Sequence, residues 1–316
     1  MASPPLKLGD YAVVVIAHDP EIQDLRKIAS QLQFTNGHRF LVDNCSRNSR
    51  EVKYIAAAFG FSYIRNSNNL GIAAALNSLE ALLPEHIVAI IAFDQDSFPQ
   101  LGYCEHLFQL YRRASKRGNN IAAVGGLVID TPSYTPLKFV RVRWHGVQTL
   151  TIEGEHPQPD FLIISGTLVS RVALIDSGGY DEQLFVDNVD VEWSYRVRSL
   201  GYKLMGTSEV FLLHRIGESL INLKPLGTTL KLHSAQRTEI MTKSRFLSYR
   251  KDSLPLSWKI HDLVRFVCKT LITVAASRDR LRRINMVVSG AAQGLREPVA
   301  TLGPRGRRLS HCEDRA

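Results

Sequence analysis

Two carboxylates close one of the most apolar runs of the chain. Asp94 and Asp96, separated by Gln95, follow the segment IVAIIAF, which is typical of a buried strand. A turn at the end of such a strand would hold both carboxylates at the rim of a sheet, where oxygen ligands bind Mg²⁺ or Mn²⁺. An ion there would neutralise the charge of a departing diphosphate. The alternative is a solvated turn, because Asp-x-Asp is a common sequence, but the position directly after an apolar run favours the metal site.

Polar residues also follow the other apolar runs. Asp19 comes after YAVVVIA, and Asp43 begins DNCS after a short run, where its carboxylate could accept a hydrogen bond from the imide N–H of uracil or thymine. The alternative for Asp43 is a residue that satisfies its own turn. His214 follows VFLL and could complete a metal shell, the alternative being a structural histidine.

A helix start and an acidic cluster add two further candidates. Asn69 and Gly71 lead into GIAAALNSLEAL, whose first N–H groups could face a phosphate or sugar, although Asn is also a common cap. Asp187, Asp190 and Glu192 supply possible general bases. Asp190 and Glu192 also precede a helical pattern, so the helix dipole is an alternative reason for their presence.

The elements that must position these residues alternate between strand and helix. The patterns predict strands at 11–17, 40–42, 61–64 and 86–93, and helices at 21–32, 50–59 and 71–83. This alternation predicts an open α/β sheet, in which ligands bind beyond the carboxyl ends of the strands. The acidic and polar candidates lie at those ends.

Length and composition indicate one large domain with an appendage. Among the 316 residues, the four cysteines are widely separated, and no stretch has the length of a signal peptide core or a membrane span. We therefore expect a cytoplasmic protein with a catalytic domain at 8–220, a basic helical extension at 221–300 and a basic tail at 301–316. The boundary should fall between 217 and 227.

The positive charge is concentrated in the extension. Residues 224–283 contain fourteen Lys and Arg against four acidic residues, whereas the net charge of the whole chain is +9. Helical patterns at 258–274 and 281–295 carry apolar and basic residues, which would suit the inner face of the cytoplasmic membrane. The alternative is a helix packed on the catalytic domain or in a dimer. A nucleic-acid-binding protein is a distant alternative that we disfavour, because no binding motif is present and the acidic motifs would repel phosphates.

Seven motifs in order resemble one enzyme family. They are VVVIAHDP, VDNCS, NNLGIAAALN, FDQDSFP, ISGTLVSR, GGYDEQLFVDNVDVEWSYRVRSLGY and LLHRIG, spread over residues 11–217. The chain resembles the inverting family 2 glycosyltransferases, in particular the bacterial rhamnosyltransferases. The resemblance implies a GT-A fold, that is, a Rossmann-like open mixed sheet, with a C-terminal helical extension.

The resemblance also implies roles for residues. Asp43 would recognise the nucleobase, and Asp94 and Asp96 would bind the ribose and the diphosphate with its metal ion. His214 would assist in holding the metal, and Asp190 would be the catalytic base. Nucleotide-sugar contacts would also come from the remaining polar and small residues of these motifs, namely Asp19, Asn69, Gly71, Gln95, Ser165 and Gly166. Two departures from the family pattern affect this assignment of roles. Val189-Asp190 stands where a Glu-Asp pair is usual, and residues 235–246 read AQRTEIMTKSRF in place of the aromatic and Arg-Asn stretch common in rhamnosyltransferases.

The implied reaction is metal-dependent transfer of L-rhamnose from dTDP-L-rhamnose, with inversion, using Mn²⁺ or Mg²⁺. The acceptor would be a saccharide or a lipid-linked saccharide in the synthesis of cell-surface polysaccharide or glycolipid, such as lipopolysaccharide O-antigen. UDP-galactofuranose and UDP-N-acetylhexosamine are the alternative donors, because motif spacing does not distinguish the sugars.

Overall fold

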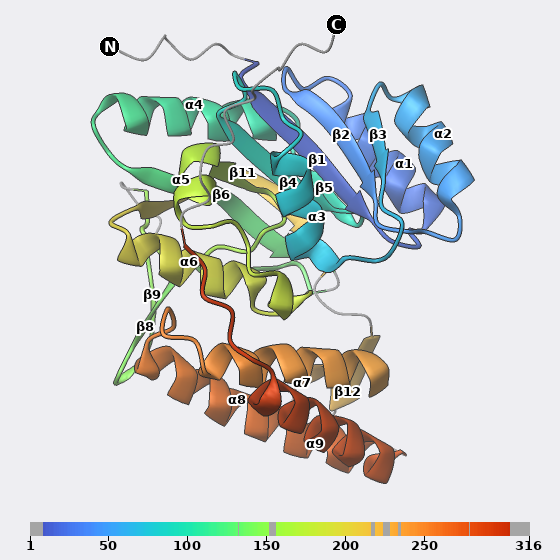
Figure 1. The fold of residues 1–316 in the computed structure, drawn as a ribbon, viewed down its shortest axis with the longest axis vertical. Coiled ribbons are helices and arrows are strands. Elements are labelled where there is room, and N and C mark those ends of the chain that lie inside the picture. The colour runs from blue at the N-terminus through green and yellow to red at the C-terminus, as the bar shows by residue number, and fades with distance from the viewer. Residues whose placement is uncertain are drawn as a thin grey trace, which may run out of the picture.

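A mixed sheet forms the centre of the protein (Figure 1). The computed structural model describes residues 9–131, 133–151, 156–215, 219–223, 228–232, 235–277 and 279–303. The strands of the central sheet are β1 (Tyr11–Ala17), β2 (His38–Asp43), β3 (Ser62–Arg65), β4 (Ala89–Asp94), β5 (Ser97–Pro99), β6 (Ile121–Asp130), β7 (Thr135–Pro136), β10 (Thr167–Ser170) and β11 (Lys203–His214). Their order is β3-β2-β1-β4-β10-β6-β11-β5, with β7 paired to β6.

The first half of the sheet is parallel and the second half is mixed. Strands β1 to β4 pair in parallel, whereas β10 runs antiparallel to both β4 and β6, and β5 runs antiparallel to β11. The predicted strands and the open mixed sheet are therefore confirmed. The strand expected at 86–93 begins at Ala89, and the one expected at 40–42 extends from His38 to Asp43.

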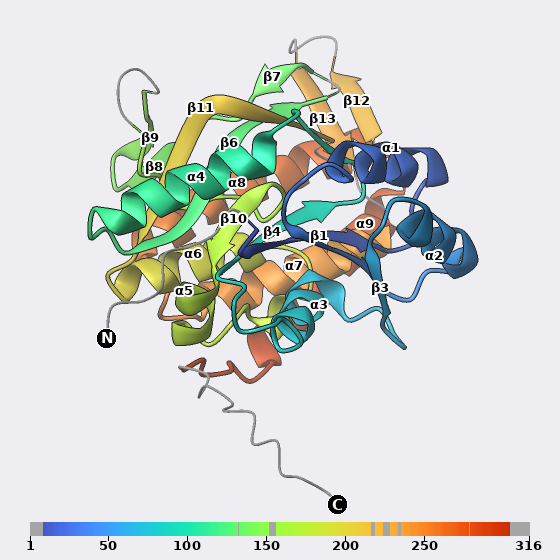
Figure 2. The same ribbon diagram turned by 90° about the horizontal axis from the view of Figure 1, so that it is seen from above.

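Helices cover both faces of the sheet (Figure 2). They are α1 (Ile22–Leu32), α2 (Ser49–Ala58), α3 (Gly71–Glu80), α4 (Tyr103–Lys116), α5 (Arg171–Asp176), the 3₁₀ helix η1 (Glu182–Leu184) and α6 (Val189–Ser199). Alternate residues of β1 point to opposite faces: Val13 and Val15 pack with α1, α2 and α4, while Ala12 and Val14 pack with α3, α5 and α6. Burial on both faces explains why β1 is almost entirely apolar.

Three helices follow the sheet and form the lower part of the molecule in Figure 1. They are α7 (Ala235–Tyr249), α8 (Leu256–Ala276) and α9 (Arg280–Arg296), so the two helices predicted in the basic extension are confirmed. Two hairpins stand outside the central sheet: β8 (Val140–Arg143) with β9 (Gly146–Thr149), which contacts α8, and β12 (Ser219–Leu223) with β13 (Thr228–Leu232). Among the described residues, no helix is long and apolar enough to cross a membrane.

The expected domain boundaries stay predictions. The boundary region 217–227 and the tail 301–316 lie largely outside the described residues. Within the described part, α7 is closely joined to the sheet, because Leu247 is fully buried in the same cluster as Val14 and Leu76. Its other side packs against α9, where a Cβ on Gly294 would lie 2.4 Å from the carbonyl oxygen of Lys243.

Candidate active site

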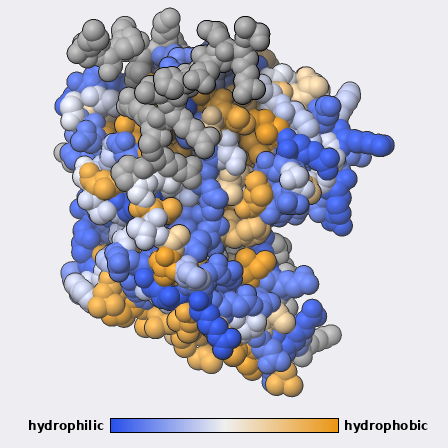
Figure 3. Space-filling model, viewed as in Figure 1, coloured by the Kyte–Doolittle hydropathy of each residue, from blue (hydrophilic) through white to orange (hydrophobic). Residues whose placement is uncertain are grey.

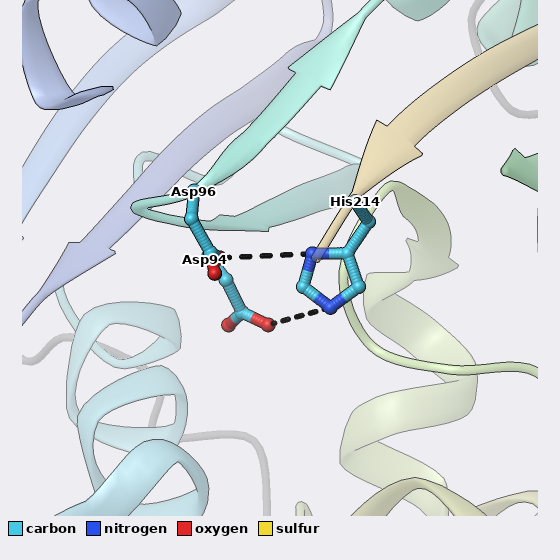
Figure 4. A group of neighbouring side chains, drawn as sticks. All are labelled: Asp94, Asp96 and His214. Atoms are coloured by element: carbon cyan, nitrogen blue, oxygen red, sulfur yellow. Dashed lines mark ion pairs between the residues drawn. The ribbon is translucent and has the colours of Figure 1, made fainter. Parts of the chain in front are cut away.

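Two carboxylates and an imidazole meet at the carboxyl edge of the sheet (Figure 4). Asp94 ends β4, Asp96 lies in the turn before β5, and His214 ends β11. In the antiparallel pairing of β5 with β11, Ser97 is the partner of His214, which places the imidazole beside Asp96. His214 Nε2 lies 3.7 Å from Asp94 Oδ2, and His214 Nδ1 lies 3.6 Å from Asp96 Oδ1. The sheet thus joins residues that are 118 positions apart along the chain.

This group fits a divalent cation. One ligand atom from each of the three residues lies within 4.8 Å of the others, and all three side chains are partly exposed. Carboxylate oxygens suit Mg²⁺ and Mn²⁺, an added imidazole favours Mn²⁺, and the exposure leaves room for ligand oxygens from a substrate. Burial raises the pKa of Asp94, Asp96 raises it further, and His214 and Arg237 oppose the shift. A bound cation would favour the charged form of this carboxylate.

Two buried serines support the group from below. Ser97 Oγ lies 2.8 Å from His214 Nδ1 and 2.6 Å from Ser165 Oγ, and Ser165 Oγ accepts a hydrogen bond from the backbone N–H of Asp94 at 3.1 Å. If Nδ1 carries the proton and donates to Ser97, the Nε2 lone pair is free for a metal ion. Ser165, predicted as a nucleotide-sugar contact, therefore lies beneath the carboxylates. Ser97 stands in the quoted motif FDQDSFP, but the sequence analysis assigned it no role.

Gln95 and Asp19 organise the loops beside this group. Gln95 Oε1 accepts the backbone N–H of His18 at 2.8 Å. The two oxygens of Asp19 accept the N–H and Nε–H of Arg47, each at 2.7 Å. The backbone N–H of Arg47 is the largest cause of the lowered pKa of Asp19. Both side chains tie β1 to neighbouring loops, and their predicted contacts with a nucleotide sugar stay predictions.

Asp43 is buried at the end of β2. Its Oδ1 accepts the backbone N–H of Ser46 and its Oδ2 accepts the hydroxyl of Tyr63, both at 2.7 Å. Its side chain is 0% exposed. This geometry supports the alternative in which Asp43 satisfies its own turn. Direct contact with a base would require Tyr63 to move, and it stays a prediction.

An asparagine network shapes the entry to α3. Asn69 Oδ1 accepts from Asn44 Nδ2 at 2.9 Å and from the Gly71 N–H at 3.0 Å, so this N–H is already paired. Asn44 Oδ1 accepts from the N–H of Leu70 and from Asn66. Gly71 has φ +76°, and a Cβ there would lie 2.5 Å from the carbonyl oxygen of Phe185. Asn44, which lies in the quoted motif VDNCS at a strand end, is thus an organising residue for which the sequence predicted no specific role.

Gly166 has no side chain, so Ala92 of β4 and Leu212 of β11 can both lie close to it. Its N–H donates to the carbonyl of Ala92 at 2.7 Å, and its carbonyl accepts the hydroxyl of Tyr103 at 2.7 Å. A Cβ on Gly166, which has φ +77°, would lie 2.5 Å from Leu212. Packing accounts for the glycine, and its role toward a nucleotide sugar stays a prediction.

Asp190 lies in the first turn of α6, near enough to Asp94 for the two carboxylates to interact electrostatically. Its Oδ1 accepts the N–H of Val191 at 2.8 Å. Burial raises the pKa of Asp190 to about 7, and the carboxylates of Asp187 and Asp94 contribute to the increase while the Val191 N–H opposes it. A carboxylate with such a pKa can accept a proton near neutral pH.

The other two acidic candidates are held by arginines. Glu192 is 2% exposed and accepts hydrogen bonds from Arg196 at 2.9 and 2.8 Å and from Ser253 at 2.8 Å. Asp187 lies 3.4 Å from Arg245 of α7. Glu192 is thus a structural residue, and Asp190 stays the predicted base.

A cation on α7 was also missed. Arg237 lies near enough to Asp94 and Asp187 for its charge to lower the pKa of both carboxylates. Its signal was the segment 235–246, which was noted only as a departure from the family pattern. No sequence pattern connected this helix with Asp94, because their proximity depends on how the chain returns over the sheet.

Comparisons with known proteins agree with this geometry. No protein-family model matches the chain. The chain is 27% identical over 291 residues to dTDP-rhamnosyl transferase RfbF of Shigella flexneri, covering 90% of this chain and 95% of that protein. The structure of this chain is similar to a crystal structure of GalNAc-T7 with UDP, GalNAc and Mn²⁺. The TM-score is 0.53, and the similarity covers 79% of this chain at 15% sequence identity. The chain spans about half, 53%, of that structure. The structural similarity shows the fold, which is GT-A.

Proposed function

We propose that this protein, a glycosyltransferase with the GT-A fold, transfers L-rhamnose from dTDP-L-rhamnose to a hydroxyl group of a saccharide or lipid-linked acceptor. The observation that carries the reaction class is the group formed by Asp94, Asp96 and His214 at one edge of the sheet, together with Asp190, which lies near enough for the charge of Asp94 to raise its pKa. The similarity to a dTDP-rhamnosyl transferase over 90% of the chain supports the donor.

The residues divide the chemistry between them. Asp94, Asp96 and His214 would hold Mn²⁺ or Mg²⁺, and the bound ion would supply positive charge to neutralise the leaving diphosphate. The oxygen of the acceptor hydroxyl attacks the anomeric carbon on the side opposite the diphosphate. Asp190 removes the proton from this hydroxyl during the attack. A single in-line displacement inverts the configuration, so dTDP-β-L-rhamnose yields an α-L-rhamnoside. No covalent sugar intermediate on the protein is required, since attack and departure occur in one step.

The remaining predicted residues would shape the donor pocket. We keep Asp43 as the residue near the base, Asp94 as a ribose contact in addition to its metal role, and the other small and polar residues as nucleotide-sugar contacts: Asp19, Asn69, Gly71, Gln95, Ser165 and Gly166. Their hydrogen bonds in the structure hold the loops at the ends of β1, β2 and β4. Several of them therefore act by positioning the pocket.

The proposal includes a place of action. We propose that the enzyme works in the cytoplasm, with peripheral contact to the inner face of the cytoplasmic membrane, in synthesis of cell-surface polysaccharide or glycolipid such as lipopolysaccharide O-antigen. A lipid-linked acceptor would make that location useful.

A donor panel tests the function. Purified protein with Mn²⁺ is given dTDP-L-rhamnose, UDP-galactofuranose or a UDP-N-acetylhexosamine, and nucleotide release is measured with and without a panel of saccharide acceptors. We expect release from dTDP-L-rhamnose, its loss in EDTA, and an α-linkage in the product by NMR. A higher kcat/KM with either UDP donor would replace rhamnose in the proposal, and a retained anomeric configuration would exclude single displacement.

A further inference from the structure

The outer side of α8 exposes a continuous apolar stripe. Six aliphatic residues between 40% and 65% exposed lie along it: Leu256, Ile260, Leu263, Val264, Val267 and Leu271. At 3.6 residues per turn they fall on one side of the helix. Helices of folded proteins normally bury such a stripe, so its exposure marks an interaction surface.

Helix α9 continues this surface. Leu281, Ile284, Val288 and Leu295 are between 42% and 78% exposed and share one side of α9. In Figure 3, hydrophobic side chains gather along the lower edge of the molecule, where α8 and α9 lie in Figure 1. We call the ten exposed aliphatic residues of the two helices the α8–α9 face.

Cations lie near the edges of this face on both helices. On α8, at about 100° per residue, Lys259 falls about 40° beyond one edge of the exposed arc, whereas Arg265 lies nearly opposite the stripe. On α9, Arg280 falls just beyond one edge and Arg296 beyond the other, whereas Arg282 lies farther round the helix. An apolar stripe with Lys and Arg at its edges is the pattern of a helix that lies in the plane of a membrane interface.

An exposed tryptophan stands next to the face. Trp144, at the tip of the β8–β9 hairpin, is 68% exposed. The hairpin is attached to α8, because His261 Nε2 lies 2.8 Å from the carbonyl oxygen of Arg143. Tryptophan is enriched at the level of lipid headgroups, where its ring is apolar and its N–H can be hydrated.

We infer that the α8–α9 face, with Trp144 beside it, docks on the surface of a membrane rich in anionic lipid. The α8–α9 face would thus make the membrane contact of the proposed function. The assignment rests on that function only for the use of a lipid-linked acceptor. Charge decides between a membrane and a second copy of the chain. In a symmetric dimer the bordering cations of one copy would meet those of the other, whereas anionic headgroups complement them.

Vesicle flotation of the full chain tests the inference. Phosphatidylcholine vesicles with phosphatidylglycerol should carry the protein upward, vesicles of phosphatidylcholine alone should not, and high salt should weaken binding. The triple variant Leu256→Gln/Val264→Gln/Leu271→Gln should bind at least about tenfold more weakly. Its matched control is Leu82→Gln/Leu101→Gln/Val172→Gln, which changes exposed aliphatic residues of the sheet domain and should bind normally.

A second pair of variants tests the cations. Lys259→Gln/Arg280→Gln/Arg296→Gln should lose most of the dependence on phosphatidylglycerol, while Arg26→Gln/Lys53→Gln/Arg113→Gln, which removes exposed cations from α1, α2 and α4, should keep it. If both charge variants lost this dependence equally, only the net charge of the protein would matter, and the inference would be overturned. Absence of flotation of the natural chain, or equal flotation with neutral vesicles, would also overturn it.

Two more measurements separate the possible failures. Light scattering that finds a dimer for the natural chain and a monomer for the aliphatic variant would assign the face to a second copy. Release of dTDP from dTDP-L-rhamnose with a soluble acceptor or water should be unchanged in every variant, because none of the replaced residues belongs to the catalytic site. Loss of flotation with intact release overturns the membrane inference alone, and absence of release with intact flotation overturns the proposed donor alone.

Discussion

His214 can ligate a metal ion through Nε2 only if its proton resides on Nδ1. Ser97 Oγ lies 2.8 Å from Nδ1 and is fully buried, so it can accept a hydrogen bond from Nδ1–H and select that tautomer. Ser97→Ala should therefore raise the Mn²⁺ concentration for half-maximal activity by about tenfold, with little change in kcat at saturating Mn²⁺. Titration of activity with Mn²⁺ measures this. Ser78→Ala, at an exposed position of α3, is the control, and an unchanged Mn²⁺ requirement for Ser97→Ala would contradict the role.

Asp190 and Glu192 have opposite environments in the same helix. Asp190→Asn keeps an oxygen for the N–H of Val191 but cannot take up a proton, so kcat should fall by about 10²- to 10⁴-fold with little change in donor affinity. Glu192→Gln should instead lower the free energy of unfolding, because Arg196 would keep its charge among buried groups. Kinetics combined with urea unfolding separates the two effects. Turnover that survives in folded Asp190→Asn but not in folded Glu192→Gln would reverse the assignment.

The pKa of Asp190 also predicts a pH profile. A base acts in its deprotonated form, so kcat/KM should rise about tenfold per pH unit below the pKa and level off above it. With a pKa of about 7 in the free protein, and a bound cation able only to lower it, the inflection should lie at or below 7. The profile of kcat/KM is recorded at constant saturating Mn²⁺. An inflection well above 7, or the same inflection in Asp190→Asn, would assign the titration to another group.

The location of a side chain in the site was predictable where the residue directly follows a strand, because the end of the strand fixes where that residue lies. The group formed by Asp94, Asp96 and His214 assembles as the sequence suggested, because all three follow apolar runs that end at one edge. The bond of Asp43 to the Ser46 N–H matches the turn alternative, but its second partner was not predictable. Tyr63 comes from the next strand at the same edge, and no local pattern encodes which hydroxyl arrives there.

At the scale of elements, periodicity found the parallel half of the sheet. Strand β1 has the predicted bounds, and α1 differs by one residue, because each element buries enough apolar surface to show its own period. The antiparallel strands β5 and β10 have three and four residues, too few to show a period, and they are strands only because of their neighbours. The pairing of β5 with β11 nevertheless positions His214, so the least predictable strand carries part of the site.

The junction of α3 with the acidic loop depends on a glycine. In Gly71→Ala the new Cβ would meet the carbonyl of Phe185 at 2.5 Å, in addition to the cost of φ +76°. Gly118→Ala is a matched control, since Gly118 has φ +77° and no described residue lies within 4 Å of its Cβ position. Gly71→Ala should be less stable than the control by about 1–3 kcal/mol, and it should lower kcat by moving the segment that leads to Asp190. Urea unfolding and kinetics measure both effects, and equal stability of the two variants would remove the steric argument.

At the scale of the whole molecule, α7 connects the two ends of the enzyme. One side of this helix buries Leu247 in the sheet domain, and the hydroxyl of Ser244 donates to the carbonyl of Leu184 at 2.6 Å. Its other side packs on α9 through Gly290 and Gly294. The proposed membrane face and the catalytic edge are therefore parts of one packed structure, so docking of the former would fix the orientation of the latter relative to the lipid surface.

A buried ion pair tests whether the molecule unfolds as one unit. Lys251, just after α7, pairs with Asp181 next to η1, and the two side chains are 4% and 1% exposed. Lys251→Met leaves the Asp181 carboxylate buried without its cation, which should cost about 3–5 kcal/mol of unfolding free energy. The double variant Lys251→Met/Asp181→Asn should recover most of this loss, because asparagine can still accept the Gln183 N–H. Lys243→Met is the control, since its pair with Glu297 is about one-third exposed and should contribute at most about 1 kcal/mol.

Urea unfolding followed by circular dichroism measures these stabilities, and the shape of the curve decides the organisation. If the sheet and the C-terminal helices are one cooperative unit, Lys251→Met should shift a single transition to lower urea, because the pair contributes to the stability of both parts. If 8–220 and 221–300 unfold independently, the variant should show an early transition with the helical amplitude of α7 to α9 and a later one unchanged from the natural chain. That second result would support the domain division expected from the charge distribution. The first would mean that the basic helices are part of the catalytic domain's own core.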